Sequence, residues 1–227
     1  MGHGGQMSRE SSKTGFTDVL LVQTMGIAVQ FMGFMKASLI LITSLCLISC
    51  APAKSSYFGE GTFVGVTPSG EEIRFANLGK DQIALNVYSP DCVPCWKEIP
   101  ALNLLHAEIQ NKFPNKALFM VVDPYQIVPD VTDELPFGQV YQLAKDRMNL
   151  EIKNRNIQVP IVFMKKPFRV KEGGLVTGTP ETLLFETNPL RLYYNFLGSI
   201  SELTNKEEIQ KDSKFQFFRY QFGMESI

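Results

Sequence analysis

The sequence predicts an α/β domain that begins with a β-hairpin. From Thr62 onward, strand-like and helix-like patterns alternate along the chain, which favours one α/β domain over separate helical and sheet modules. A short apolar, β-prone run at residues 83–88 is followed by a segment with helical spacing and then by a second apolar run. This order is typical of a βαβ unit.

The length and composition agree with one medium-sized domain plus a further segment. Of the 227 residues, 44% are hydrophobic and 20% are charged, which is ordinary for a globular chain with one buried core. The net charge is −1, and Lys and Arg are dispersed among Asp and Glu. Because phosphate backbones require a basic stripe, we expect no nucleic acid partner.

The first predicted elements are the hairpin and the βαβ unit. Residues 61–66 and 71–75 form the hairpin, joined by a turn at Thr67-Pro68-Ser69-Gly70. Residues 83–88 and 117–122 form two buried strands. Between them we expect a helix from residue 94 to about residue 110, with a kink at Pro100, because apolar residues recur at helical spacing: Ile99, Leu102, Leu105 and Ile109.

The second half is predicted to contain a long loop, two helices and three strands. Residues 123–136 hold three prolines and form the loop, and residues 138–155 resume helical spacing. A closing helix from residue 201 to about residue 220 places Ile209, Phe217 and Tyr220 on one side. The strands are expected at residues 159–164, 182–186 and 191–196, with an Asn188-Pro189 turn between the last two.

The front of the chain resembles a targeting segment. Residues 37–47 form an apolar run behind Met35-Lys36, about the length of a signal-peptide h-region and short for a membrane span. The run ends in Leu47-Ile48-Ser49-Cys50, which resembles a bacterial lipobox, where a peptidase cuts before the cysteine and the thiol is acylated. The resemblance implies a signal segment over residues 1–49, a tether over residues 50–60 lipidated at Cys50, and a folded domain over residues 61–227.

Two alternatives stay open for this segment. We expect translation to begin at Met35; if it begins at Met1, residues 19–47 form a membrane-spanning anchor interrupted by Lys36. The other alternative is a plain apolar helix that contains a cysteine by chance.

Two cysteines form the candidate active site. With Cys46 in the signal and Cys50 lipidated, only Cys92 and Cys95 remain in the exported domain. Two thiols separated by two residues at a strand-to-helix junction can cycle between dithiol and disulfide. We expect Cys92 at the helix N-terminus, where unpaired N–H groups and the helix dipole favour its thiolate. We expect Cys95, one turn further along, to be less exposed and to resolve a mixed disulfide.

Two neighbours are expected to modulate the pair. Pro94 lacks an N–H and pre-sets a helical dihedral at the helix start, so it restricts the positions that the two sulfur atoms can take relative to each other. Asp91 places a carboxylate beside Cys92 and is expected to raise the pKa of its thiol, which makes the activation milder. Outside the cytosol, such a dithiol also needs a dedicated electron donor to stay reduced.

Other chemistries fit the two cysteines less well. A structural zinc needs four ligands, and the domain adds only His106, about 16 Å along the helix from Cys95. We therefore interpret His106 as a partly buried helix residue. Copper delivery needs a further soft or imidazole ligand near the pair, and the Pro-x-x-x-Thr-x-x-Cys run of a thiol peroxidase does not occur. An inert disulfide stays an alternative, although so short a loop constrains little of the unfolded chain.

The chain resembles the thioredoxin superfamily, particularly the membrane-anchored TlpA/ResA-like thiol-disulfide oxidoreductases. The resemblance covers about residues 62–198 and rests on the order hairpin, strand, Cys92-x-Pro-Cys95, then Lys97-Glu98-x-Pro-x-Leu102. It implies a thioredoxin-like fold with a central mixed β-sheet flanked by helices. Gly178-Thr179-Pro180 resembles the family's cis-proline loop, so the resemblance implies that Thr179 and Pro180 bind an extended substrate. Pro160 is the rival for the cis proline.

The chain departs from the family pattern at three positions, which we predict to support the site. Asp91 stands where the family commonly has an aromatic residue, and Trp96 follows the second cysteine instead. Asn86 stands where many thioredoxins have a buried acid that relays the proton of the resolving thiol. Glu98 is a candidate substitute for that acid, but the favoured interpretation of Glu98 is a solvated helix residue.

These features predict an exported thiol-disulfide oxidoreductase of the cell envelope, anchored through Cys50, in which Cys92 attacks and Cys95 resolves. By resemblance, its partners are protein thiol or disulfide substrates, an envelope electron donor and the membrane, and its role is in cytochrome c maturation or the reduction of other envelope thiols. We expect no cofactor and no metal. The alternatives are a non-catalytic thioredoxin-fold surface lipoprotein and a copper-delivery protein.

Overall fold

The computed structural model describes residues 63–132, 134–165, 170 and 174–224. The chain divides into two units, Met1–Lys54 and Ser55–Ile227, and every described residue belongs to the second. The predicted targeting segment and the lipidation site Cys50 lie outside the described residues. Within the described part of the chain, no helix has the length and hydrophobicity needed to cross a membrane.

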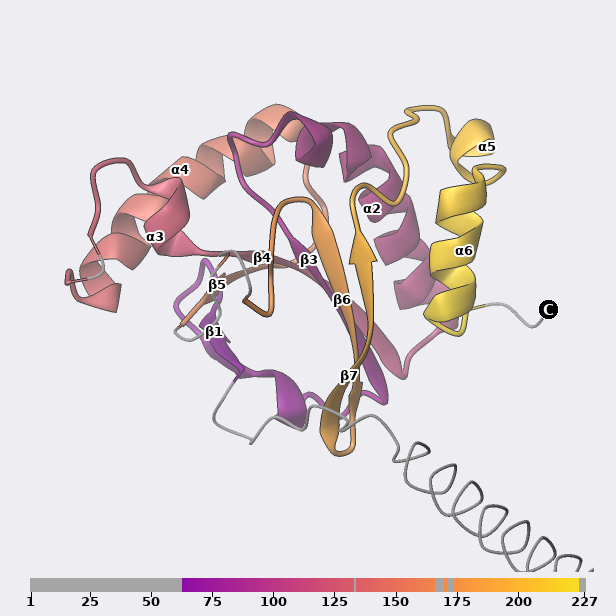
Figure 1. The fold of residues 1–227 in the computed structure, drawn as a ribbon, viewed down its shortest axis with the longest axis horizontal. Helices are drawn as coiled ribbons and strands as arrows, with labels where there is room; N and C mark the ends of the chain where they lie inside the picture. Colours follow the sequence, from indigo (N-terminus) through magenta and orange to yellow (C-terminus); the bar gives the residue numbers. More distant parts are fainter. Residues whose placement is uncertain (1–62, 133, 166–169, 171–173, 225–227) are drawn as a thin grey trace, which may run out of the picture. The chain divides into compact units, whose positions relative to one another are not determined.

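A mixed sheet of seven strands forms the centre of the domain (Figure 1). The strand order is β2-β1-β5-β4-β3-β6-β7. Strand β4 runs parallel to both β3 and β5, and the other neighbours are antiparallel. The strands are β1 (Val64–Val66), β2 (Glu72–Arg74), β3 (Gln82–Val87), β4 (Lys116–Val122), β5 (Ile161–Met164), β6 (Glu181–Thr187) and β7 (Leu190–Leu197).

The predicted hairpin and βαβ unit are confirmed. Strands β1 and β2 pair in antiparallel register around the turn, where the Gly70 N–H donates to the Thr67 carbonyl over 2.9 Å. Strand β3, helix α2 and strand β4 form the βαβ unit. The helices are α2 (Val93–Lys112), α3 (Pro124–Ile127), α4 (Phe137–Arg155), α5 (Lys206–Ile209) and α6 (Ser213–Gln221), with a 3₁₀ turn at Phe75–Asn77.

Gly65 lets the hairpin pack flush against the sheet. Strand β1 pairs on its other side with β5, and a Cβ atom on Gly65 would lie 2.2 Å from Val162 Cγ1 and 2.9 Å from the Phe163 carbonyl oxygen. Only glycine fits so close an approach.

The predicted loop at residues 123–136 contains the short helix α3. The Asp123 side chain accepts a hydrogen bond from the Tyr125 N–H over 3.1 Å, and Pro124 occupies the first helical position. An Asp cap followed by proline is a helix-start signal, so the prediction of an unstructured loop was wrong over these residues.

The predicted single closing helix was also wrong, because the chain forms α5 and α6 instead. Asp212 starts α6 by accepting a hydrogen bond from the Lys214 N–H over 2.9 Å. The interruption changes the helical phase, so Phe215 and Phe218 are buried. Phe217 and Tyr220, which were predicted to share a face with buried Ile209, are 44% and 46% exposed.

The core consists of two clusters, one on each face of the sheet. Alternate strand residues point to opposite faces. Helices α2, α4 and α6 pack on one face, where Leu102, Met148 and Phe218 join Ala84 of β3. The opposite face gathers Ile83, Leu85, Phe63, Phe75 and Val176.

Candidate functional site

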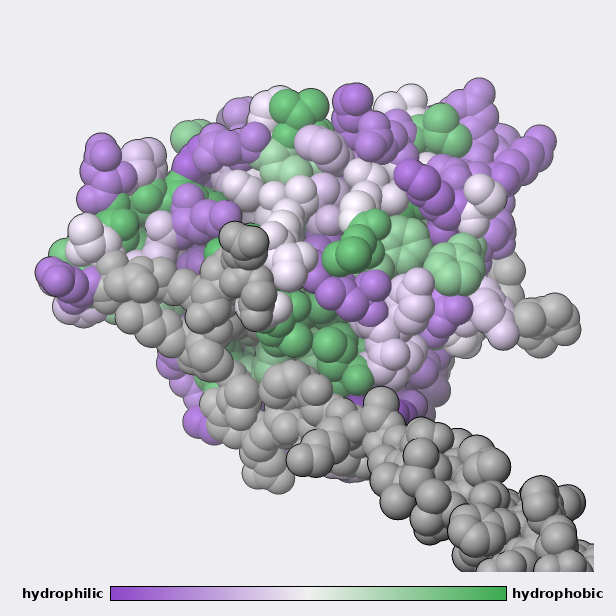
Figure 2. All heavy atoms as spheres, viewed as in Figure 1, coloured by the Kyte–Doolittle hydropathy of each residue, from purple (hydrophilic) through white to green (hydrophobic). Residues whose placement is uncertain are grey.

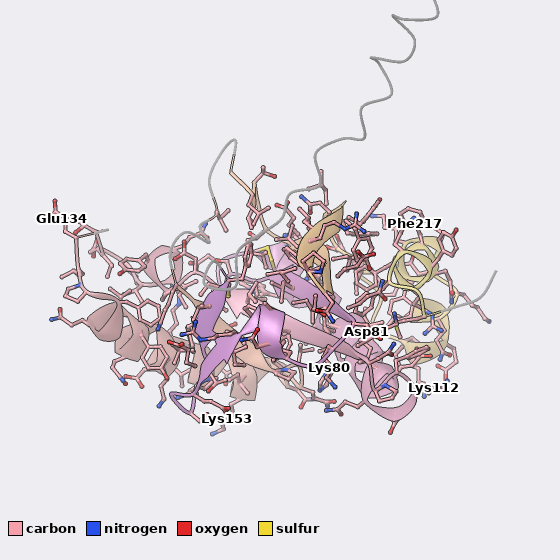
Figure 3. The ribbon with its side chains drawn as sticks, turned by 90° about the horizontal axis from the view of Figure 1, so that it is seen from below. Lys80, Asp81, Lys112, Glu134, Lys153 and Phe217 are labelled. Atoms are coloured by element: carbon pink, nitrogen blue, oxygen red, sulfur yellow. A yellow bond between two sulfur atoms is a disulfide. The ribbon has the colours of Figure 1, made fainter. Side chains whose placement is uncertain are left out.

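The two cysteines of the predicted motif are joined in a disulfide at the start of α2 (yellow bond in Figure 3). Cys92 is the N-cap residue, with an extended backbone, and its sulfur accepts a hydrogen bond from the Cys95 N–H over 3.2 Å. The Cα atoms lie 5.3 Å apart. Cys95 is fully buried, whereas Cys92 is half-buried and its neighbour Val93 is 48% exposed. Only the first sulfur is therefore accessible to a large partner.

Glu98 is the most unusual residue of the site. It lies one helical turn after Cys95 and its side chain is fully buried. Its Oε1 accepts a hydrogen bond from Asn86 Nδ2 over 2.8 Å, and its Oε2 accepts one from the Ile200 N–H over 3.0 Å. The favoured interpretation of a solvated helix residue was therefore wrong.

Burial raises the pKa of Glu98 from its ordinary value of 4.5 to about 7. The charge of Glu202 raises it further, while the hydrogen bonds from Asn86 and Ile200 act in the opposite direction. A carboxyl with such a pKa can accept or donate a proton near neutral pH.

Asn86 links strand β3 to this carboxyl. Its Nδ2 also donates to Thr182 Oγ1 on β6 over 2.9 Å, and its Oδ1 is buried without a hydrogen-bond partner among the described residues. A side-chain amide does not take up or release a proton near neutral pH, so Asn86 cannot relay one. It instead donates a hydrogen bond to the Glu98 carboxyl, which can.

Asp91 forms an ion pair with α4. Arg147 Nη2 lies 2.6 Å from Asp91 Oδ1, and the side chains are 30% and 70% exposed. Arg147 also donates to the Ile127 carbonyl. The pair offsets part of the negative charge that the sequence places beside Cys92, so we infer a weaker effect of Asp91 on the thiol than expected from its carboxylate alone.

Trp96 is held between the loop before Cys92 and α4. Its Nε1 donates to the Pro90 carbonyl over 2.7 Å, and the guanidinium of Arg155 lies 3.8 Å from the ring centroid. Arg155 pairs with Glu151, which also accepts a hydrogen bond from the Tyr88 hydroxyl over 2.9 Å. These contacts fix the indole next to the cysteine pair.

The predicted cis-proline loop lies at the same end of the sheet as the disulfide. The Thr179-Pro180 bond is cis, as is Asn188-Pro189 in the turn between β6 and β7. The Pro160 alternative is not among the cis bonds of the described residues. The first residue of β6, Glu181, pairs with Val87, the last residue of β3, and the chain reaches Cys92 five residues later.

Three consecutive residues after β7 connect the loop to α2. The Gly198 N–H donates to the Pro180 carbonyl over 3.0 Å, the Ser199 hydroxyl lies 3.5 Å from the Pro94 carbonyl, and the Ile200 N–H donates to Glu98. Residues 198–200 therefore contact the cis proline, the start of α2 and the buried Glu98 carboxyl. No local pattern signals these contacts, because two of them join residues about a hundred positions apart.

The described residues contain no group of three His, Cys, Asp or Glu side chains that could hold a metal ion. His106 lies further along α2 and is partly buried, and burial lowers its pKa.

The sheet order, the cysteine pair at the start of α2 and the cis proline before β6 define a thioredoxin-like fold. No family model matches the sequence, and no curated protein matches it.

The chain is similar to solved structures of thiol-disulfide proteins. A secreted thiol-disulfide isomerase from Corynebacterium glutamicum is 17% identical, with a TM-score of 0.45, over 71% of this chain and 90% of that one. A thiol:disulfide interchange protein from Bacteroides sp. is 15% identical, with a TM-score of 0.47, over 75% and 97%. StoA from Bacillus subtilis is 19% identical, with a TM-score of 0.42, over 70% and 98%.

Proposed function

We propose that this chain is a thiol-disulfide oxidoreductase that exchanges disulfides with protein partners. The observation that carries the proposal is the disulfide between a half-buried Cys92 and a fully buried Cys95 at a helix start, next to a cis proline. A disulfide that closes so short a loop adds little to the stability of the fold. A purely structural role therefore does not account for this arrangement.

In the reducing direction, the reaction begins with the Cys92 thiolate. It attacks one sulfur of a substrate disulfide, a mixed disulfide forms, and the other substrate sulfur leaves as a thiolate that takes a proton. The helix N-terminus favours the Cys92 thiolate that attacks.

The second step releases the substrate. Cys95 loses its proton and its thiolate attacks Cys92 Sγ, so the intramolecular disulfide forms and the remaining substrate sulfur leaves as a thiolate that takes a proton. Glu98 is suited to accept the Cys95 proton, because both are buried one turn apart on α2 and the pKa of Glu98 is about 7. The reverse sequence oxidises a substrate dithiol.

The surface around the site suits a polypeptide substrate. Exposed apolar side chains flank it, with Val93 48% and Leu197 69% exposed. Apolar side chains also form a patch over β7 and α6 (Figure 2), beside a groove of about 500 Å³ whose lining includes Leu197, Phe196 and Phe217. The cis proline leaves the adjoining backbone available for strand-like pairing with an extended segment.

Reduction of insulin disulfides by dithiothreitol tests the activity. The full chain should accelerate it, Cys92→Ser should abolish the acceleration, and Cys95→Ser should stop turnover by leaving the mixed disulfide unresolved. Cys50→Ser is the matched control, because it replaces a cysteine and keeps both Cys92 and Cys95. A wild-type chain without activity on insulin would contradict the proposal.

The proposed location is the cell envelope, with a lipid on Cys50. The lipobox-like Leu47-Ile48-Ser49-Cys50 supports it. Mass spectrometry of the native N-terminus should find acylated Cys50, and Cys50→Ser should release the protein from membranes. An unlipidated chain that starts at Met1 would exclude the lipoprotein.

The proposed partners are an envelope electron donor and protein thiols or disulfides, apocytochrome c among them. Equilibration in glutathione buffers gives the reduction potential and hence the direction of electron flow. Copper retention is a separate readout, measured on the reduced chain with Cu(I) in buffer without glutathione. A copper-delivery protein would retain Cu(I), and a non-catalytic surface lipoprotein would neither retain Cu(I) nor cycle between dithiol and disulfide.

A further inference from the structure

A buried carboxylate stands directly after the cis proline. Glu181 is 1% exposed. Its Oε2 accepts hydrogen bonds from the Thr177 N–H over 2.8 Å, from the Gly178 N–H over 3.1 Å and from the Thr177 hydroxyl over 3.3 Å. Its Oε1 accepts one from Asn195 Nδ2 on β7. All of these neighbours are donors, so they match a carboxylate, which only accepts.

These bonds leave one residue of the loop unpaired. The N–H groups of Thr177 and Gly178 are bound to Glu181, while Pro180 has no N–H and its carbonyl accepts from Gly198. Within the described part of the chain, neither backbone group of Thr179 bonds to another backbone group. Thr179 is half-buried, and the segment 198–200 connects its loop to the start of α2.

We propose that Glu181 is a positioning residue for substrate binding. It fixes Thr177 and Gly178 from the inside, so that the unpaired backbone of Thr179 is held ready to pair with an extended segment of a polypeptide substrate. This proposal rests on the proposed function. Because the loop is already ordered in the free protein, no binding free energy is lost in ordering it when the substrate binds.

A glutamine in place of Glu181 would mismatch the site. Its side chain would offer one acceptor oxygen and one NH₂ group. Either the NH₂ group would face the Thr177–Gly178 N–H groups, or it would face Asn195, whose amide would have to turn over and leave its own NH₂ group buried without an acceptor among the described residues. Adding Asn195→Asp in a double variant would restore the match. The glutamine oxygen would then accept from the loop, and the glutamine NH₂ would donate to the new carboxylate.

The test compares a protein disulfide with a small one that has no peptide backbone. For Glu181→Gln we expect the KM for insulin to rise about tenfold, with little change in kcat. The rate with hydroxyethyl disulfide should stay within about twofold, since that substrate cannot pair with Thr179. Glu181→Gln/Asn195→Asp should recover most of the loss. The matched control is Glu186→Gln, on the same strand but paired with Arg191 at the surface.

Amide hydrogen exchange on the wild-type chain gives a readout that needs no activity. The N–H groups of Thr177 and Gly178 should be protected, and exchange at the rate of an open loop would overturn the proposal. Equal loss on both substrates, no loss, or a folded double variant as impaired as Glu181→Gln would also overturn it. If the wild-type chain turns over no protein disulfide, the proposed function itself fails, and the positioning role fails with it.

Discussion

Asn86 and Glu98 form a fully buried hydrogen-bonded pair, with 2.8 Å between Asn86 Nδ2 and Glu98 Oε1. The pair joins strand β3 to helix α2. Since an uncompensated buried charge is costly, this carboxyl links the stability of the domain to pH, and it does so in the range where thiols exchange.

Glu98→Gln should remove this pH dependence. The pKa of Glu98 in the folded state, about 7, lies above the ordinary value of 4.5 expected in the unfolded chain. The folded state therefore binds the proton more tightly, and stability falls as pH rises from 4.5 through 7. The wild-type free energy of unfolding should drop by roughly 3 kcal/mol, at about 1.4 kcal/mol per unit, over this range relative to Glu98→Gln. Urea unfolding of the oxidised protein at each pH measures it.

Glu202→Gln is the control for this prediction. The charge of Glu202 makes a smaller contribution that raises the pKa of Glu98, so its removal should lower that pKa slightly. The upper end of the stability transition should then move to slightly lower pH, and the transition itself should remain. A wild-type profile as flat as that of Glu98→Gln would contradict the buried, titrating carboxyl.

The two thiols of the reduced protein should differ in reactivity. Cys95 is fully buried and Cys92 is half-buried, so iodoacetamide should alkylate Cys92 at least about tenfold faster. Mass spectrometry of the peptide that contains both cysteines measures the two rates, and the difference should vanish in urea. Equal rates in the folded protein would show that Cys95 is accessible.

Arg147→Gln should slow the alkylation of Cys92. It leaves the negative charge of Asp91 without its ion-pair partner, and a negative charge beside a thiol disfavours the thiolate that reacts. The pair is exposed, so the expected effect on alkylation at pH 7 is modest, about two- to fivefold. Added salt should reduce it. The double variant Asp91→Asn/Arg147→Gln should return toward the wild-type rate, and a double variant as slow as Arg147→Gln would assign the effect to something other than Asp91.

Gly65→Ala should weaken the packing of the hairpin against the sheet. The added Cβ would lie 2.2 Å from Val162 Cγ1, and overpacking of this kind costs about 1–3 kcal/mol. Gly138→Ala is the matched control: it lies in α4 with nothing within 4 Å, so it should gain about 0.5–1 kcal/mol. Urea unfolding measures both, and a neutral Gly65→Ala would show that β1 can move away from β5.

The elements that could be predicted from the sequence depend on local patterns. The hairpin has a Pro68-Ser69-Gly70 turn, and α2 has apolar residues at helical spacing after a capping Cys92. The break before α6 could not be predicted from spacing alone, because apolar residues continue across it at intervals that suit one helix. Its signal is the single cap of Asp212, which a pattern of apolar residues does not contain.

The candidate site was predictable only in part. The cysteine pair and the cis Thr179-Pro180 bond each follow from a short motif of consecutive or nearly consecutive residues. The burial of Glu98 does not, because its second partner is the N–H of Ile200, 102 residues away. The burial of the Glu181 carboxylate could not be predicted for a similar reason, because its partner Asn195 lies on the neighbouring strand β7.

Trp96 has a practical consequence. It is the one tryptophan of the chain, it directly follows Cys95, and it is fixed by Pro90 and Arg155. All indole fluorescence therefore originates beside the disulfide. The molecule carries an intrinsic optical probe, with which oxidation, reduction and the arrival of a partner can be followed in real time without a label.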